Sequence, residues 1–190
     1  SNNGRNGWDW CSGYHYSDSV IVGFAHKHLS GTGIGDLGDI LFQPTTISLT
    51  EDEYHGGKVF HQRFSAAFSH DEEEASPGYY RVTVREPETG LRPIRVELTA
   101  TERTGFHRYS YPADEAVNLM LDLGFAVNWD APVETSIHIE NDTLITGFRK
   151  SKGWANNQQV FFAAVFSKPM TSYTLYKTGL ENPGMRNVLG

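Results

Sequence analysis

The sequence predicts an all-β protein built as a large sandwich of two antiparallel sheets, because strand-like alternation and turn residues dominate it and no convincing amphipathic helix is present. Apolar and polar residues alternate without a slip over residues 94–101, and the same period of two runs through residues 80–85 and 118–123. Such alternation is typical of half-buried strands. Further strands are expected at residues 20–24, 39–43, 45–49, 59–68, 105–111, 135–140, 143–148, 159–166 and 172–176. This series exceeds the about seven to nine strands of an immunoglobulin-like module, so a larger sandwich is expected.

Turn-forming residues separate these strands. An Asn-Asp pair at residues 141–142 lies between two alternating runs and predicts a two-residue hairpin turn. Ser-Pro-Gly at residues 76–78 and Glu-Thr-Gly at residues 88–90 also favour turns. The acidic run at residues 71–74 is expected to be a solvated loop.

Composition excludes several classes of protein. The 190 residues are 38% hydrophobic and 21% charged, an ordinary globular mix for one domain. The net charge of −7 and the absence of a concentrated basic face argue against binding to nucleic acid. No apolar run approaches the about 20 residues of a membrane-spanning helix. The single cysteine, Cys11, cannot form an intrachain disulfide.

The first segment that breaks the strand pattern is residues 8–16. It places four aromatic rings and a histidine within nine residues, beginning with Trp8, Asp9 and Trp10. Aromatic rings stack on the C–H faces of sugars, and nearby polar groups bind hydroxyls, so this composition suits a carbohydrate pocket. Core tryptophans at the start of a strand explain the residues equally well.

The second segment is residues 26–39, in which glycines alternate with hydroxyl residues after His26 and His28. The spacing of Gly31 and Gly33 does not match a dinucleotide-binding loop, and no helix follows. A zinc site would need at least a third ligand that is not evident. Ser30 lacks the strained turn and the base partner of a nucleophile. A structured turn packed beneath a binding site is the simplest interpretation.

The third segment is residues 102–109, where charged residues, Phe106 and a histidine lie between two strands. A surface hairpin with cross-strand ion pairs and a ligand site explain it about equally well. A glycosidase needs two placed carboxyl groups. The sequence singles out no such pair, because the acids lie in expected turns or, like Glu97 and Glu140, on the expected solvent side of strands.

These segments resemble glycoside hydrolase family 92, the calcium-dependent exo-acting α-mannosidases. Residues 8–14 followed by residues 23–33 look like the family's N-terminal signature, a G-F-S-H-x-H-L-S-G-T-G run. Ala25 and Lys27 stand where serine and threonine are more usual. Segments at residues 68–80, 97–109, 147–154 and 160–168 follow in the family's order. An ordered series is more specific than any one motif.

The resemblance implies that residues 1–190 form a single β-sandwich domain, incomplete at both ends, with a fold like the galactose mutarotase supersandwich. A separate helical barrel domain is expected to carry the catalytic acid, the catalytic base and the ligands of Ca2+, so this chain alone is expected to be inactive and to bind no metal. The parent enzyme is expected to invert the anomeric centre and to release mannose, commonly α-1,2-linked, from N-glycans. A bacterial source and a secreted, periplasmic or cell-surface location are expected.

The resemblance also suggests site residues. Trp8, Trp10 and Phe106 are expected to be walls of the mannose pocket, with His28 as a further substrate-binding residue. Pocket shaping or domain contact is expected of Asp9, Ser30, Gly31, Thr32, Gly33 and Asp36. An exposed aromatic patch is expected around residues 8–16 and 26–36. A stand-alone carbohydrate-binding module and a mutarotase-like epimerase using His and Glu stay open as alternatives, although neither explains the ordered motifs.

Overall fold

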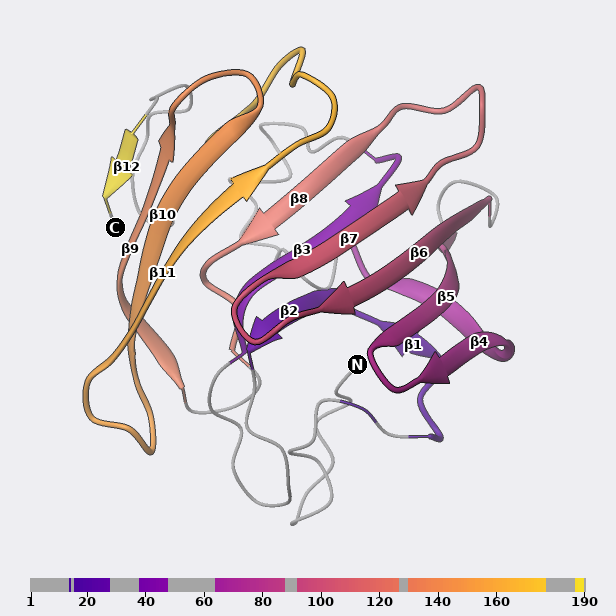
Figure 1. The fold of residues 1–190 in the computed structure, drawn as a ribbon, viewed down its shortest axis with the longest axis horizontal. Helices are drawn as coiled ribbons and strands as arrows, with labels where there is room; N and C mark the ends of the chain where they lie inside the picture. Colours follow the sequence, from indigo (N-terminus) through magenta and orange to yellow (C-terminus); the bar gives the residue numbers. More distant parts are fainter. Residues whose placement is uncertain are drawn as a thin grey trace.

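The computed structural model describes residues 14, 16–27, 38–47, 64–87, 92–126, 130–176 and 187–189. Within them the chain forms twelve strands and no α-helix, and every strand pairing is antiparallel (Figure 1). The all-β antiparallel sandwich predicted from the sequence is confirmed. None of the described residues belongs to a helix long and apolar enough to cross a membrane.

The strands of the described residues form three hydrogen-bonded sheets. The five-stranded sheet has the order β1-β4-β5-β6-β7, and its strands are β1 Val20–Ile21, β4 Ala66–Ser76, β5 Tyr79–Arg85, β6 Pro93–Ala100 and β7 Gly105–Ser110. The three-stranded sheet has the order β2-β3-β8, with β2 Phe24–Lys27, β3 Asp39–Thr45 and β8 Asn118–Asp122. The four-stranded sheet has the order β11-β10-β9-β12, with β9 Ala131–Ile139, β10 Leu144–Lys152, β11 Gln158–Val165 and β12 Asn187–Leu189.

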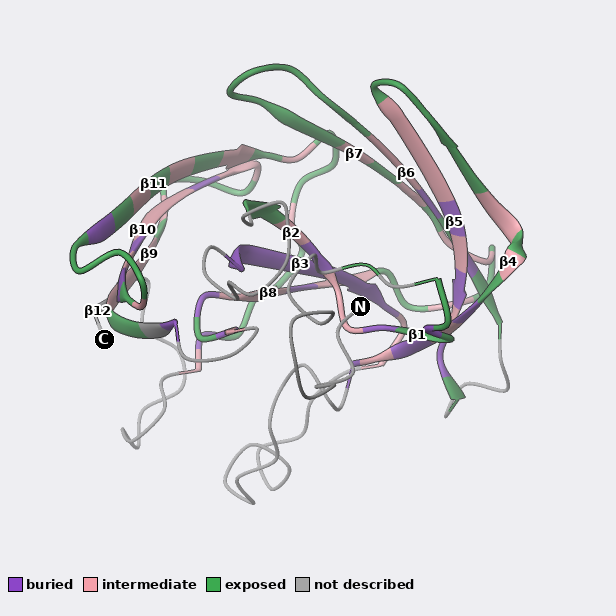
Figure 2. Cartoon of the chain, turned by 90° about the horizontal axis from the view of Figure 1, so that it is seen from below, coloured by how far each residue is buried: buried purple, intermediate pink, exposed green. Residues whose placement is uncertain are grey.

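The two larger sheets arch over the three-stranded sheet (Figure 2). Beneath the five-stranded sheet lies an apolar cluster that includes Val82, Val84, Ile94 and Val96, all fully buried. On the other side, Ile40 and its neighbours in the three-stranded sheet pack against side chains of the four-stranded sheet. The three-stranded sheet is therefore the inner layer that joins the two halves of the sandwich.

Several strand predictions need correction. Residues 71–74 belong to β4 and not to a loop. The pairing of β4 with β5 shifts in register between Phe68 and Glu73, and two arginines of β5, Arg81 and Arg85, form ion pairs with the acidic run. Residues 172–176 form no strand. Of the strand predicted at residues 45–49, Thr45 is the last residue of β3, and residues 46–47 form no strand.

Two further predictions were too simple. The strand predicted at residues 20–24 is broken at Gly23, whose φ of +151° favours glycine and whose added Cβ would lie 2.7 Å from Leu41 Cγ. The hairpin between β9 and β10 turns over residues 140–143, where the Asn141 side chain accepts hydrogen bonds from the amide and hydroxyl of Thr143 at 2.9 Å. Residues 59–63 and 88–90 lie outside the described residues, whereas the turn at residues 76–78 is confirmed.

Candidate functional site

The second and third segments meet where β2 ends and β7 begins. His26 of β2 stacks on His107 of β7, with ring centroids 4.7 Å apart and an interplanar angle of 7°. The edge of Phe42 in β3 meets both rings, at 5.2 Å from His26 and 6.0 Å from His107. A Cβ on Gly105 would lie 2.9 Å from His26 Cδ2, so a residue without a side chain permits this approach. The stack joins the five-stranded and three-stranded sheets.

Phe106 lies beside this stack and points away from it. Its exposed fraction is 61%, whereas His107 is partly buried, as alternation along β7 requires. Of the four residues predicted to bind substrate, Phe106 is the one that the structure describes. An exposed ring at the start of a strand can stack on the apolar face of a sugar.

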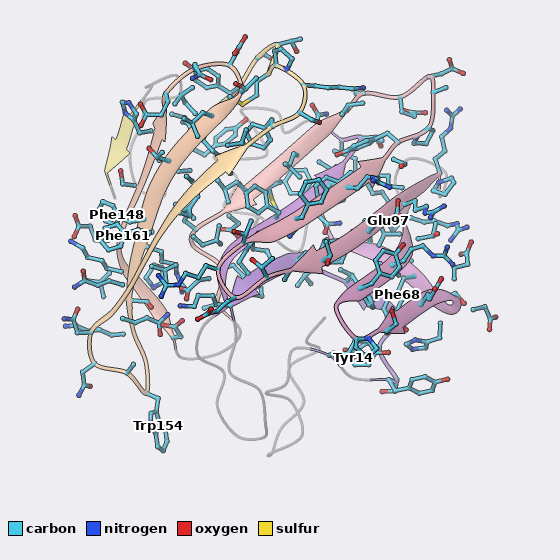
Figure 3. All side chains as sticks on the ribbon, in the orientation of Figure 1. Tyr14, Phe68, Glu97, Phe148, Trp154 and Phe161 are labelled. Atoms are coloured by element: carbon cyan, nitrogen blue, oxygen red, sulfur yellow. The ribbon has the colours of Figure 1, made fainter. Side chains whose placement is uncertain are left out.

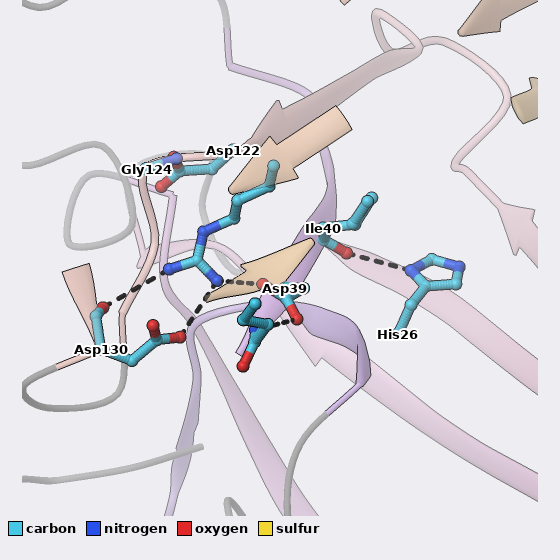
Figure 4. A network of polar contacts seen from close by, with 8 residues as sticks. His26, Asp39, Ile40, Asp122, Gly124 and Asp130 are labelled. Carbon is cyan, nitrogen blue, oxygen red and sulfur yellow. Dashed lines mark hydrogen bonds and ion pairs between the residues drawn. The ribbon is translucent and has the colours of Figure 1, made fainter. Parts of the chain in front are cut away.

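Burial sets the protonation state of His107 in the histidine stack. Burial, together with the smaller effect of the nearby His26, lowers the pKa of His107 to about 4. His107 is therefore neutral near pH 7, and its Nδ1 lies 2.6 Å from the Tyr109 hydroxyl. The Nδ1–H of His26 donates to the carbonyl oxygen of Ile40 at 3.0 Å (Figure 4). Because a carbonyl only accepts, this bond assigns the proton of His26 to Nδ1.

A buried polar network begins one residue before Ile40. Arg149 of β10 donates to Asp39 of β3 and, at 3.3 Å, to Asp130 (Figure 4). Gln158 of β11 donates from Nε2 to the second carboxylate oxygen of Asp39 at 2.8 Å. The side chains of Arg149, Asp39 and Asp130 are fully excluded from solvent. The network thus fixes the first residue of β3 to the four-stranded sheet.

The network holds one guanidinium between two carboxylates. Burial raises the pKa of Asp39 and outweighs the opposing effect of Arg149. Arg149 Nε and the Ser151 hydroxyl have no hydrogen-bond partner within the described residues, although both are buried. The described ranges contain no group of three or more His, Cys, Asp or Glu side chains that could hold a metal ion.

The described end of the first segment lies against β4. Tyr16 stacks on His70, with ring centroids 4.3 Å apart, and Tyr14 donates from its hydroxyl to Glu73 at 3.0 Å. The Tyr80 hydroxyl donates to the other Glu73 oxygen at 2.6 Å. His70 donates from Nδ1 to Glu73 and from Nε2 to the carbonyl of Tyr16. Two acceptors require both ring nitrogens to carry protons, and the hydrogen bond to Glu73 accordingly raises the pKa of His70.

No local pattern in the sequence indicates this cluster, although residues 68–80 are among the family-like segments. The acidic run was interpreted as a loop, so nothing indicated that Glu73 would lie beside His70. Tyr14 and Phe68 lie on the same side of the molecule, opposite Phe148 and Phe161 (Figure 3). The cluster anchors Tyr14 and Tyr16 to the β4 edge, four to six residues after Trp10.

The third segment forms the predicted surface hairpin with a cross-strand ion pair. Arg108 faces solvent and lies 3.8 Å from Glu97 of β6, a cross-strand ion pair. The Tyr79 hydroxyl donates to Glu97 at 2.9 Å, and this bond, with Arg95 and Arg108, lowers the pKa of Glu97. His107, on the opposite face, joins the stack. The other predicted site residues lie outside the described residues and stay predictions: Trp8, Asp9, Trp10, His28, Ser30, Gly31, Thr32, Gly33 and Asp36.

Comparison with known proteins gives one family. Residues 1–189 match the family described as Glycosyl hydrolase family 92 N-terminal domain. The structure is similar to that of the family GH92 α-mannosidase BT3965 from Bacteroides thetaiotaomicron, with 31% identity and a TM-score of 0.78 over 96% of this chain and 25% of that chain. The same enzyme in complex with mannoimidazole matches equally well, over 24% of its chain. The GH92 family glycosyl hydrolase ccman5 is 26% identical, with a TM-score of 0.65, over 80% of this chain and 20% of that chain.

No curated protein matches the sequence. The chain spans about a quarter of the length of the α-mannosidase that it resembles.

Proposed function

This chain belongs to the N-terminal domain of glycosyl hydrolase family 92, and from that premise we propose that it forms one wall of the mannose-binding cleft of an exo-acting α-mannosidase. The family match over residues 1–189 carries the proposal. The 31% identity to an α-mannosidase over 96% of the chain supports it. The meeting of the second and third segments beside Phe106 supports the location of the wall.

Phe106 supplies a flat apolar surface for one face of the sugar, since its ring is largely exposed. In the proposal Trp8 and Trp10 extend this wall, and His28 binds sugar hydroxyls. The remaining family-like residues shape the pocket or contact the neighbouring domain; these are Asp9, Ser30, Gly31, Thr32, Gly33 and Asp36.

The chemical step belongs to another part of the parent enzyme in this proposal. Inverting hydrolysis needs a carboxylic acid and a carboxylate about 6.5–9.5 Å apart, with room for water between them. Two acidic side chains described above already have other partners. Glu97 pairs with arginines, and Glu73 accepts hydrogen bonds from tyrosines and His70. A helical barrel domain supplies the acid, the base and the Ca2+ ligands. The substrate is α-1,2-linked mannose of N-glycans, encountered outside the bacterial cytoplasm.

The test uses the full-length parent enzyme and α-1,2-mannobiose. Proton NMR at early time should show β-mannose as the first product, and a chelator should abolish turnover until calcium is restored. The isolated 190-residue chain should release no mannose. First formation of α-mannose would contradict inversion, and mannose release by the isolated chain would contradict the division of labour.

Phe106 can be tested against a matched phenylalanine. Phe106→Ala should raise KM about tenfold with little change in kcat, because stacking on the sugar is made equally in the ground state and the transition state. Phe161 of β11 is 68% exposed and lies in the four-stranded sheet, so Phe161→Ala should leave KM unchanged. Equal effects of the two substitutions on KM would show that Phe106 does not contact the sugar.

A further inference from the structure

A continuous series of contacts leads from buried Arg149 to exposed Phe106. We infer that Arg149, acting through Asp39, is a positioning residue that holds Phe106 in place for sugar binding, an inference that rests on the proposed function. Arg149 lies in the four-stranded sheet and Phe106 in the five-stranded sheet. The three-stranded inner sheet connects them.

The first step fixes the start of β3. Asp39 receives a hydrogen bond on each carboxylate oxygen, one from Arg149 and one from Gln158. Two donors from two different strands define both the position and the rotation of the carboxylate. Because all three side chains are buried, water cannot replace either donor.

The second step is an unusual backbone conformation at the next residue. Ile40 has a φ of +54°, in the left-handed region that a β-branched residue rarely adopts. Such a conformation persists only where the surrounding structure enforces it. Because strained backbone of this kind is concentrated at functional sites, it motivates a functional hypothesis here. Here Asp39 is held on one side, and the Ile40 carbonyl accepts from His26 Nδ1 on the other. The network thereby places the ring of His26.

The third step carries this placement to β7. His26 stacks on His107, and the missing side chain of Gly105 lets the imidazole lie against the strand. Phe106 lies between Gly105 and His107 in the chain, so both of its neighbours contact His26. A shift of His26 therefore moves the backbone that carries the exposed ring. Loss of the network should loosen Phe106 without removing any atom of it.

A purely structural role would also make Arg149 important for folding, so stability alone cannot decide. The distinguishing property is energetic coupling between the two positions. If Asp39 acts on the sugar only through Phe106, changing either residue removes the same contribution to binding, and changing both removes it only once. In the full-length parent enzyme, Asp39→Asn and Phe106→Ala should each raise KM about tenfold for α-1,2-mannobiose, with kcat nearly unchanged. The double variant should also show a rise of about tenfold, and not about one hundredfold. Strictly multiplicative effects, or a normal KM for Asp39→Asn, would overturn the inference.

Two variants separate positioning from general loss of stability. Ile145→Ala removes a buried side chain of β10 outside the contact series and should lower the melting temperature while leaving KM unchanged. Gln158→Met removes one of the two donors to Asp39 at similar volume, and it replaces Asp39→Asn in the cycle if that variant does not fold. A raised KM in Ile145→Ala would overturn the inference. Failure of the wild-type parent to release mannose would instead refute the proposed function, and the inference with it.

Discussion

The two halves of the sandwich have different interiors. Beneath the five-stranded sheet lies a buried apolar cluster, in which Val82 and Ile94 are fully excluded from water. Between β3 and β10 equally buried positions hold Asp39 and Arg149. Apolar burial is non-directional and scales with area, whereas a buried ion pair depends on exact geometry.

The candidate site lies between these two interiors, where His26 of the three-stranded sheet stacks on His107 of the five-stranded sheet. An apolar core tolerates small shifts of one layer against another as long as volume is conserved. The Arg149 network fixes the position of β3 and, through His26, of β7. The apolar half therefore provides stability, and the polar half provides position.

The largest effect is expected for removal of the guanidinium. Arg149→Ala leaves two buried carboxylates without their cation and should lower the free energy of unfolding by about 3–5 kcal/mol. Arg81→Ala is the control, since Arg81 and its partner Glu74 are both exposed and such pairs contribute about 0–1 kcal/mol. Urea unfolding at neutral pH measures both. Similar losses of stability in the two variants would mean that the buried network contributes no more to the free energy of unfolding than a surface ion pair.

The histidine stack between the three-stranded and five-stranded sheets should make the stability of the fold sensitive to acid. The pKa of His107 is lowered to about 4 in the folded chain, so below its ordinary value of 6.5 the unfolded chain binds a proton that the folded chain does not. Stability is therefore intact above that ordinary value and falls as the pH drops towards about 4. Between pH 7 and about pH 5 the loss should be about 2 kcal/mol.

The variant His107→Phe isolates this effect. It keeps a ring against His26 and removes the titrating group. The contributions of all other titrating groups to the pH dependence cancel when the variant is compared with the wild type. Urea unfolding at the two pH values gives the difference. An identical pH dependence in both proteins would show that folding does not lower the pKa of His107.

A smaller and pH-independent effect is expected in the apolar half. Ile94→Val removes one methylene from a fully buried position and should cost about 0.5–1.5 kcal/mol. The same urea experiment should give equal losses at neutral and acidic pH, because no titrating group is involved. A loss that changed with pH would break the distinction between the two interiors.

The apolar half could be predicted from the sequence and the polar half could not. Strands β5 and β6 match the predicted strands within one residue, because alternation encodes the buried face directly. Arg149 lies in the family-like segment at residues 147–154, but nothing in that segment indicates a buried ion pair. Its partner Asp39 lies 110 residues away, a pairing that tertiary packing decides and that no local pattern encodes.

The candidate site was predictable in residue type and not in arrangement. His26, Phe106 and His107 were all within segments singled out for their composition. That His26 and His107 would stack depends on how two sheets pack, which alternation does not specify. Glu73 was missed because a bulge in β4 carries an acidic run through a strand.

The smallest effect is expected at the His70–Glu73 pair, which is partly exposed. The hydrogen bond to Glu73 raises the pKa of His70. The resulting stabilisation of the fold is therefore fully present below pH 6.5, the ordinary pKa of histidine, and is lost as the pH rises through the pKa of His70 in the folded chain. Burial alone would raise the pKa of Glu73, but hydrogen bonds from Tyr80, His70 and Tyr14 lower it. That contribution is present above 4.5 and is lost in acid.

The pair should therefore stabilise the fold most between these two ordinary values. Glu73→Gln should lower the unfolding midpoint more at about pH 5.5 than at about pH 8.5. Glu74→Gln is the matched control, because Glu74 pairs with Arg81 and not with a histidine. If both variants lose the same amount of stability at both pH values, His70 is neutral in the folded chain, with a proton on only one ring nitrogen. The anchoring of Tyr14 and Tyr16 would then rest on stacking and on tyrosine hydroxyls alone.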